Sequence, residues 1–194
     1  MMQMQSKAVN CSNVIVLTSG GLDSTACIKY YIDQGFLVQG VFINYGQIAW
    51  KNEFKSAINI SKYFDINLLR LDFISDKFFY QGEIKGRNAF LIMAALMACP
   101  DFKGLICIGI HSGTPYYDCS RQFVNKMDDI LINYTNGQMA LDIPFIDWSK
   151  KMVYKYCLDN KVPIQLTYSC ENGTDIPCGR CSSCLDRGDL IGTS

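Results

Sequence analysis

A seven-residue stretch of small and polar residues constrains this chain more than any other feature: Ser19-Gly20-Gly21-Leu22-Asp23-Ser24-Thr25. Before it, Val14–Leu17 is a continuous apolar run rich in β-branched residues, which is typical of a strand buried on both faces. After it, residues 26–32 place apolar side chains at helical spacing. A strand, a glycine-rich turn and a helix in this order direct free N–H groups and the positive end of a helix dipole at one point, which favours phosphate binding.

The residue types within this stretch support the same interpretation. Gly20 and Gly21 allow close approach of the backbone and positive φ, while Asp23 can bind a metal ion or hold the loop. Three side chains add hydroxyl donors: Ser19, Ser24 and Thr25. An ordinary β–α turn is the alternative. Neither G-x-x-x-x-G-K-[ST] nor a G-x-G-x-x-G after a strand occurs, so the stretch is not one of the two commonest nucleotide loops.

The composition narrows the class of protein. The 194 residues are 49% hydrophobic and 19% charged, which is typical of a globular chain. We expect one domain over residues 1–165 and a small segment over residues 166–194. Lys plus Arg and Asp plus Glu number 18 each, so the basic excess of a protein that grips a nucleic-acid backbone is absent from the sequence.

The positions of the cysteines and the hydropathy of the sequence indicate the cellular compartment of the protein. Five of the ten cysteines lie mostly in apolar stretches and are interpreted as small core residues: Cys11, Cys27, Cys99, Cys107 and Cys157. Residues 1–11 are polar, and no apolar run approaches the ~18 residues that span a bilayer. We therefore expect a cytoplasmic protein with reduced thiols and no membrane association.

The remaining chain alternates strand-like and helix-like patterns. Further strands are predicted at residues 36–45, 66–71, 105–110 and 143–145, and helices at residues 48–63 and 89–99. Another helix opens near residues 116–123, and residues 73–85 form an irregular aromatic segment. This order predicts an α/β fold with a doubly wound parallel sheet, whose ligands bind at the carboxyl ends of the strands.

Several polar residues follow predicted strands or begin predicted helices. Arg87 and Asn88 can bind an anion at a helix start, although a solvated arginine and a capping asparagine explain them equally. Asp118 can accept two N–H bonds from a guanine-like edge, or it can be an N-cap. Lys150, near the start of a later helix, is a site cation or an ordinary surface lysine. Main-chain groups near Phe42 and Ile43 can meet an adenine ring, or these residues are simply core.

Four cysteines cluster near the end of the chain with the spacing Cys170-x7-Cys178-x2-Cys181-x2-Cys184. Gly173, Pro177 and Gly179 permit the turns that would point the thiols inward. Four sulfurs around one ion form the closed tetrahedral arrangement of structural zinc. An iron–sulfur cluster is the main alternative, and disulfides are disfavoured in a reducing compartment.

The Ser19–Thr25 stretch resembles the pyrophosphatase loop of a class of ATP enzymes, and the motifs together resemble the 7-cyano-7-deazaguanine synthase (QueC-like) family. The further motifs are Tyr45-Gly46-Gln47, Gly86-Arg87-Asn88, the segment Tyr117–Arg121, and Thr167–Cys170 with the three later cysteines. The resemblance implies the fold of the adenine nucleotide alpha hydrolase-like (HUP) proteins. It also implies ATP, Mg²⁺ and Zn²⁺ as cofactors and a homodimer, while the balanced charge disfavours a nucleic-acid partner.

The resemblance implies an ATP-dependent ligase. Its members adenylate 7-carboxy-7-deazaguanine, form the amide with ammonia and dehydrate it to 7-cyano-7-deazaguanine. Catalytic residues would be Ser19, Asp23, Arg87 and Lys150. Nucleotide-binding residues would be Thr18, Ser19, Gly20, Gly21, Leu22, Asp23, Ser24, Thr25, Phe42, Ile43, Arg87 and Asn88. Substrate-binding residues would be Tyr45, Gln47, Asp118 and Arg121, and the zinc ligands would be Cys170, Cys178, Cys181 and Cys184.

The sequence also departs from the family pattern. Ile48 and Ala49 replace a basic pair, and the segment before Gly86 is short, with Lys85 in place of a common proline. A shortened loop leaves the site more open, so a relative that joins the same carboxylate to another amine, on a protein for example, is an alternative. A tRNA-binding or tRNA-thiolating zinc protein is a third hypothesis, which the balanced charge disfavours.

Overall fold

The computed structural model describes residues 12–73, 79, 83–111 and 113–192. Its strands are β1 (Asn13–Leu17), β2 (Leu37–Asn44), β3 (Asn67–Asp72), β4 (Gly104–Ile108) and β5 (Met139–Leu141). Its α-helices are α1 (Leu22–Asp33), α2 (Trp50–Phe64), α3 (Arg87–Ala98), α4 (Arg121–Tyr134), α5 (Lys150–Asp159) and α6 (Ser182–Gly192). Two short 3-10 helices are η1 (Tyr117–Cys119) and η2 (Ile164–Leu166).

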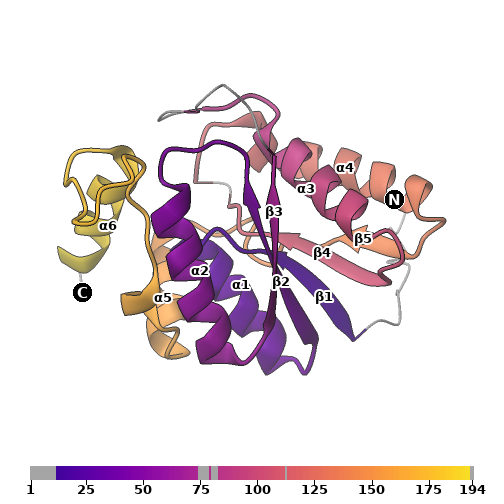
Figure 1. Ribbon diagram of the computed structural model, residues 1–194, viewed down its shortest axis with the longest axis horizontal. Coiled ribbons are helices and arrows are strands. Elements are labelled where there is room, and N and C mark those ends of the chain that lie inside the picture. Colours follow the sequence, from indigo (N-terminus) through magenta and orange to yellow (C-terminus); the bar gives the residue numbers. More distant parts are fainter. Residues whose placement is uncertain (1–11, 74–78, 80–82, 112, 193–194) are drawn as a thin grey trace.

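The five strands form one parallel sheet in the order β3-β2-β1-β4-β5. Helices α1, α2 and α5 cover one face of this sheet, and α3 and α4 cover the other (Figure 1). The predicted doubly wound α/β fold is therefore confirmed. Because the chain proceeds from β1 to β2 on one side and later returns to β4 on the other, the strand order reverses between β1 and β4. Ligands of such folds bind in the crevice at this reversal.

The side chains of the central strand β1 explain why helices pack against both faces of the sheet. Val14 and Val16 are fully buried against α1 and α5, whereas Ile15 and Leu17 pack towards α3 and α4. Successive side chains of a strand point to opposite faces, so a continuous apolar run suits a strand with helices on both sides.

The predicted last strand at residues 143–145 was wrong. The strand is Met139–Leu141, and residues 144–147 form a turn. The N–H of Asp142 still donates to Ile106 of β4, but Pro144 has no N–H, so pairing ends there. The first four strands agree with their predicted positions to within two residues, and α3 begins at Arg87 rather than Ala89. Cys11 and most of residues 73–85 lie outside the described residues.

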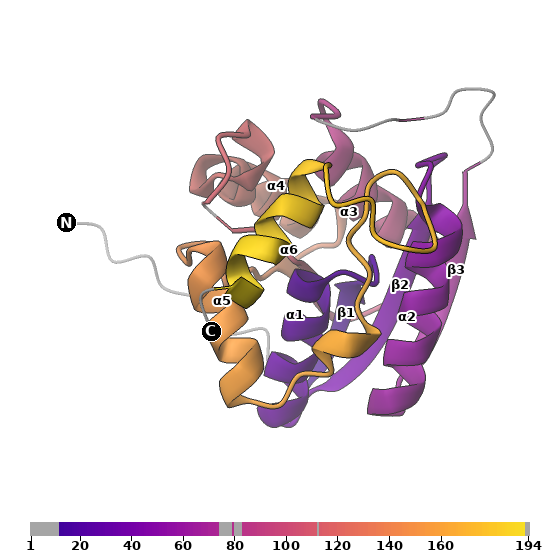
Figure 2. The same ribbon diagram turned by 90° about the vertical axis from the view of Figure 1, so that its left-hand side faces the viewer.

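The segment after η2 crosses the molecule near the carboxyl ends of the strands and finishes in α6 (Figure 2). It contacts the loop between β1 and α1 through a hydrogen bond of 2.9 Å from the N–H of Tyr168 to the carbonyl of Gly20. Within the described part of the chain, no helix is both long enough and apolar enough to cross a membrane.

Candidate active site

The loop between β1 and α1 has a shape that only glycine permits at Gly20. Its φ is +77°, and a Cβ at this position would lie 2.4 Å from the carbonyl oxygen of Glu53 in α2. The carbonyl of Gly21 accepts hydrogen bonds from the hydroxyls of Ser24 (3.1 Å) and Thr25 (2.7 Å). These two hydroxyls hold the loop in shape, and the first amides of α1 lack intrahelical acceptors. The loop therefore retains the N–H groups that bind an anion.

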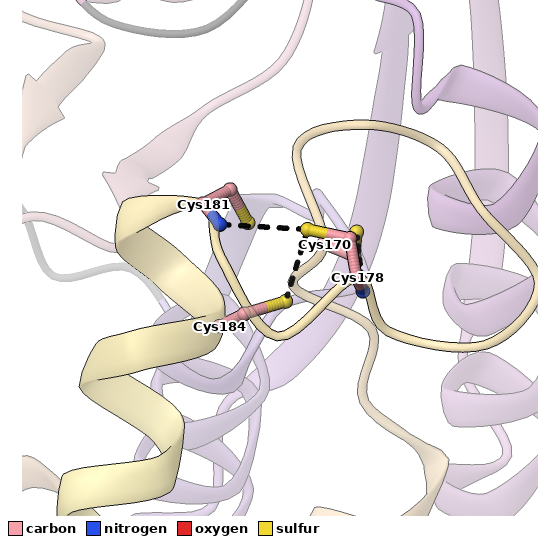
Figure 3. Close-up of side chains that lie close together, drawn as sticks. All are labelled: Cys170, Cys178, Cys181 and Cys184. Carbon is pink, nitrogen blue, oxygen red and sulfur yellow. Dashed lines mark hydrogen bonds between the residues drawn. The ribbon is translucent and has the colours of Figure 1, made fainter.

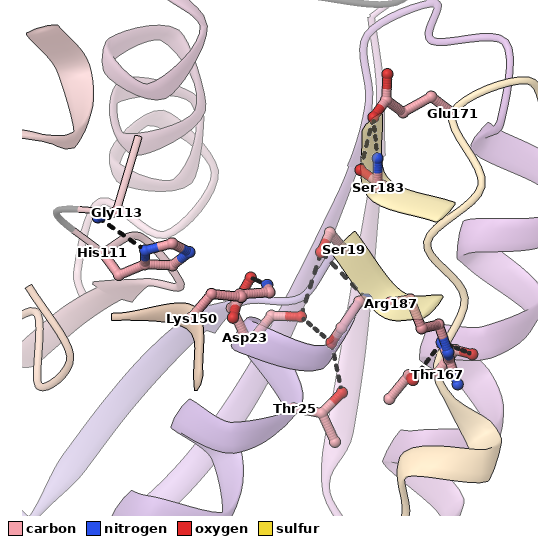
Figure 4. Close-up of polar contacts among 12 residues, drawn as sticks. Ser19, Asp23, Thr25, His111, Gly113, Lys150, Thr167, Glu171, Ser183 and Arg187 are labelled. Atoms are coloured by element: carbon pink, nitrogen blue, oxygen red, sulfur yellow. Dashed lines mark hydrogen bonds and ion pairs between the residues drawn. The ribbon is translucent and has the colours of Figure 1, made fainter. Parts of the chain in front are cut away.

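The other side chains at the loop either support the backbone, face solvent or pack against the core. The hydroxyl of Thr18 is buried and donates to Val16 at 2.9 Å, so it supports the end of β1. The hydroxyl of Ser19 lies on the exposed side of the loop, 3.2 Å from that of Ser24 (Figure 4). Leu22 packs partly against the α1 side of the core.

Two residues support the loop through the Gly20 carbonyl: Ser56, which no motif indicated, and Tyr168, which lies in the Thr167–Cys170 motif. The hydroxyl of Ser56, in α2, lies 2.8 Å from the carbonyl oxygen of Gly20 and 2.6 Å from that of Leu166. Together with the N–H of Tyr168, it fixes the Gly20 carbonyl pointing away from the crevice. Sequence reasoning missed Ser56 because a serine in the middle of an amphipathic helix carries no signal of its own.

Asp23 and Lys150 meet at the crevice between β1 and β4. The carboxylate of Asp23, in the first turn of α1, pairs with the ammonium group of Lys150, the first residue of α5 (Figure 4). The other oxygen, Oδ1 of Asp23, is buried and has no hydrogen-bond partner among the described residues. A buried carboxylate oxygen without a partner is costly in a protein and is a preferred ligand of Mg²⁺. The residues therefore fit a divalent cation beside the loop.

The end of β4 approaches this pair closely. A Cβ at Gly109, just after β4, would lie 2.7 Å from the N–H nitrogen of Ser24 and 2.8 Å from the carbonyl carbon of Asp23. Only glycine lets the end of β4 lie against the first turn of α1.

The end of β2 provides a second wall. The strand pairs with β1 only as far as Val41, where the N–H of Thr18 donates to its carbonyl, so beyond this point the β1-side edge of β2 faces the loop. The side chains of Phe42 and Ile43 are buried, which leaves their main-chain groups as the contacts available to a ligand.

The Tyr45–Gln47 turn is held by its own glutamine. The side chain of Gln47 is buried, accepts from the N–H of Tyr45 at 2.9 Å, and donates to Ile43 at 3.2 Å and Glu53 at 2.9 Å. Because these bonds use both its oxygen and its amide group, Gln47 shapes the turn that presents Tyr45.

Arg87 lies in an electrostatic cluster with this turn. Burial raises the pKa of Tyr45 and of Glu53, and the nearby Arg87 guanidinium opposes both increases. Its Nε donates to the Asn88 side chain at 3.2 Å. The structure thus brings the start of α3 towards the end of β2 and the start of α2.

Asn88 and Asp118 connect two elements that the sequence did not relate. The Asn88 side chain, which is buried, donates from Nδ2 to the carbonyl of Asp118 at 3.0 Å, and its N–H donates to the Asp118 carboxylate at 3.4 Å. The capping alternatives for both were wrong. Gly86 is the N-cap of α3, and Ser120 caps α4 by accepting from the N–H of Phe123 at 3.2 Å.

Arg121, a predicted substrate-binding residue, is turned towards solvent in this structure. Its side chain is 64% exposed, and its guanidinium pairs with Asp147 in the turn before α5. It would have to leave Asp147 to reach a ligand in the crevice.

The four clustered cysteines converge beside this site. Their Sγ atoms all lie within 4.8 Å of one another, with Cys170 and Cys178 from the loop and Cys181 and Cys184 from the start of α6 (Figure 3). Sulfurs at tetrahedral zinc, with Zn–S bonds near ~2.3 Å, are about 3.8 Å apart. Although burial opposes it, hydrogen bonds from the Thr174 hydroxyl and from the Cys178 N–H lower the pKa of Cys170 to about 5, which favours the thiolate. This donor set fits a tetrahedral metal ion.

Two further residues that no motif indicated hold the cysteine segment: Glu171 joins two parts of the segment, and Arg187 connects it to the domain. Oε1 of Glu171 accepts from the N–H and hydroxyl of Ser183 and from the Ser182 hydroxyl, at the N-terminus of α6 (Figure 4). Arg187 donates to the carbonyls of Thr167 and Ile164, both at 3.1 Å. The segment is thereby held on the strand-end side of the sheet.

Comparison with known proteins agrees with this geometry. The family model described as Queuosine biosynthesis protein QueC matches residues 13–82 and 74–190. A 7-cyano-7-deazaguanine synthase from Prochlorococcus marinus (strain AS9601) is 30% identical over 207 residues, covering 90% of this chain and 91% of the relative. Another from Picrophilus torridus is 31% identical over 208 residues, covering 91% and 85%. The fold is similar to that of NMN synthetase from Francisella tularensis, with a TM-score of 0.53 and 17% identity over 93% of this chain and 76% of that chain.

Proposed function

Because the chain belongs to the QueC family of queuosine biosynthesis proteins, we propose that it is an ATP-dependent ligase that converts 7-carboxy-7-deazaguanine to 7-cyano-7-deazaguanine. The relatives that carry this activity in their names align over most of both chains. We place the reaction in the cytoplasm, with small molecules rather than nucleic acid as substrates.

The chemistry explains why the site needs both an anion-binding loop and cations. A carboxylate is a poor electrophile, so one of its oxygens first bonds to the α-phosphorus of ATP while the bond to the pyrophosphate breaks. The nitrogen of ammonia then attacks the acyl carbon and AMP leaves, which gives the amide. A second ATP adenylates the amide oxygen with release of pyrophosphate, and loss of AMP together with the two protons on nitrogen leaves the nitrile. Each activation concentrates negative charge on phosphoryl oxygens, which preorganised donors stabilise.

The residues of the crevice would divide these tasks. Backbone N–H groups from Ser19 to Ser24 would hold the pyrophosphate, and the main chain of Phe42 and Ile43 would contact the adenine. Lys150 and Arg87 would offset phosphate charge. Mg²⁺, held by the unpartnered oxygen of Asp23, would supply further positive charge at the phosphates.

The other end of the crevice would take the deazaguanine. Asp118 would accept from its guanine-like edge, because a carboxylate matches paired N–H donors. Tyr45 would line the same space, and Gln47 would keep Tyr45 in place.

We assign the four cysteines to a structural zinc ion. All four protein ligands are sulfurs, so no position remains for a substrate, and the segment they close supports the loop through Tyr168. Metal analysis of the purified protein tests this assignment, because an iron–sulfur cluster would contain iron and sulfide and would absorb visible light.

The observation that carries the proposed function is the buried, unpartnered oxygen of Asp23, which lies beside Lys150 at the strand-order reversal. The test is incubation of metal-replete protein with ATP, Mg²⁺, ammonia and 7-carboxy-7-deazaguanine, with AMP and product mass as readouts. We expect AMP and the nitrile. An amide or acyl-adenylate that does not proceed with ammonia would indicate a different amine, such as one on a protein. Absence of AMP with every acid and amine supplied would contradict the activation step itself.

The family also suggests a homodimer. Light scattering on the same preparation determines the mass in solution.

A further inference from the structure

The chain contains a single histidine, His111, and the structure places it in the crevice although no motif included it. It is the third residue after β4 and lies two residues after Gly109, whose backbone lies against Asp23 and Ser24. His111 is therefore on the β4 side of the strand-order reversal, opposite the Ser19–Thr25 loop on the β1 side. Its side chain is buried.

A backbone contact determines which ring nitrogen of His111 carries the proton. The N–H of Gly113 donates to Nδ1 of His111 at 3.0 Å. An N–H donor requires a lone pair on Nδ1, so the hydrogen of the neutral ring is on Nε2. Burial also lowers the pKa of His111, which favours the neutral ring. Nε2 is thus a hydrogen-bond donor, and it cannot accept a proton in this tautomer.

The donor faces the charged end of the site. Figure 4 shows the ring with Gly113 on one side and Lys150 and Asp23 on the other. The charges that act on the ring come from three helices, Asp23 of α1, Lys150 of α5 and Asp186 of α6. A Cβ at Gly113 would lie 2.8 Å from Nδ1 of His111 and 3.7 Å from the backbone nitrogen of Lys150, so the turn also lies at the start of α5.

The structure assigns to His111 a role in the adenylation step that rests on the proposed function: its Nε2–H donates a hydrogen bond to an anionic oxygen of the reacting groups, the substrate carboxylate or the α-phosphate. In that step a carboxylate oxygen bonds to the α-phosphorus and pyrophosphate leaves, and no proton is transferred. A donor that keeps its proton suits this chemistry, because it stabilises developing negative charge without becoming a charged base. His111 would thus complement Lys150 with a second, uncharged donor.

Substitutions separate a donor role from a packing role. Carboxylate-dependent exchange of pyrophosphate into ATP reports the adenylation step alone. His111→Phe fills the space but removes the donor, and we expect its exchange kcat to fall about 10²-fold, with KM for ATP little changed. His111→Gln restores an N–H near Nε2, and we expect it to recover to within about tenfold of the wild type. Equal activity of the wild type and His111→Phe, or equal losses in both variants, would overturn the assignment.

A second variant moves the ring without changing it. Gly113→Ala would push a methyl group against Nδ1, so we expect a kcat defect similar to that of His111→Phe. Gly188→Ala, in α6, meets nothing within 4 Å and is the matched control. Wild-type activity of Gly113→Ala would count against the assignment even if His111→Phe failed to fold. Thermal midpoints and metal content identify any misfolded variant.

Spectroscopy tests the same inference without catalysis. Because the chain has one histidine, a ¹⁵N NMR spectrum of the full metal-replete protein, free of any purification tag, reports a single imidazole ring. We expect the Nε2–H tautomer at pH 7, and a shift of Nε2 when ATP with Mg²⁺ or the carboxylate is added. An Nδ1–H tautomer, an imidazolium, or a resonance that no ligand moves would refute the inference. Absence of exchange in the wild type would instead count against the proposed function, and the ligand-induced shift would still be measurable.

Discussion

The carboxylate of Asp23 and the ammonium of Lys150 form an ion pair across 127 residues of sequence. Each lies in the first turn of its helix, α1 and α5 respectively. A lysine opposes the macrodipole at a helix N-terminus, so the stability of α5 does not explain its position. The two side chains are 28% (Lys150) and 23% (Asp23) exposed, which keeps both accessible to a ligand. The pair therefore belongs to the site rather than to the scaffold.

Replacement of Lys150 tests this relationship. Lys150→Met keeps the length of the side chain but removes the charge, and we expect pyrophosphate exchange to fall about 10²-fold or more. The surface pair Lys155–Asp159, in the same helix, offers a matched control. Lys155→Met should leave exchange unchanged and alter the free energy of unfolding by less than about 0.5 kcal/mol. Equal rates for the two variants would contradict the role of Lys150.

Substitutions at Gly20 and Gly35 distinguish the energetic cost of a positive φ from the cost of a steric clash. Both have φ near +80°, but a Cβ at Gly35 meets nothing within 4 Å, whereas one at Gly20 meets the Glu53 carbonyl at 2.4 Å. We expect Gly35→Ala to cost about 1–2 kcal/mol through its φ alone. Gly20→Ala should cost roughly 1–3 kcal/mol more and abolish ATP binding. Urea unfolding and nucleotide titration measure the two effects; equal costs would show that Glu53 does not confine the loop.

Removal of the metal ion from the four-cysteine cluster should weaken ATP binding at the Ser19–Thr25 loop. Tyr168, whose N–H donates to Gly20, lies two residues before Cys170, so loss of the metal should release this contact. We expect Cys181→Ser to lose bound metal, lower the thermal midpoint and weaken ATP binding about tenfold, because the Gly20 carbonyl loses one of its two hydrogen bonds and keeps only that from Ser56. Cys99→Ser, outside the cluster, is the control. Unchanged ATP affinity in the metal-free variant would show that the segment does not support the loop.

Glu53 should make the free energy of unfolding depend on pH. Burial raises its pKa in the folded protein, even though Gln47 and Arg87 favour the charged form. The folded state therefore holds this proton more tightly than the unfolded state, so stability falls as pH rises from about 4.3, the ordinary glutamate value, through the raised pKa. Glu53→Gln should remove this part of the decline and be more stable than the wild type at pH 7.

Urea unfolding across this pH range makes the comparison. Replacement of the exposed Glu83 by glutamine is the control and should leave the decline in place. A Glu53→Gln variant less stable than the wild type at pH 7 would show that the charged carboxylate stabilises the fold.

Local sequence patterns predicted the first four strands. They placed the last strand wrongly, because pairing with β4 selects its residues. Met139–Leu141 and residues 143–145 are both short apolar segments, and periodicity does not distinguish them. The register with β4 selects the former. In the same way, Asp118 fits the composition of an N-cap, but the hydroxyl of Ser120 reaches the free N–H group of Phe123.

Features that are local in the chain could be predicted from the amino-acid sequence. The glycine turn between an apolar strand and a helix, and four thiols within a short segment, depend on backbone conformation and on neighbouring residues. The distant residues that complete the site became evident only from the folded chain: Lys150 for Asp23, Ser56 and Tyr168 for Gly20, and Asn88 for Asp118. These residues meet because the parallel sheet brings the segments after β1 and β4 and the first halves of α2, α3 and α5 to one edge. Burial and geometry across tens of residues select such pairs, and no local pattern encodes them.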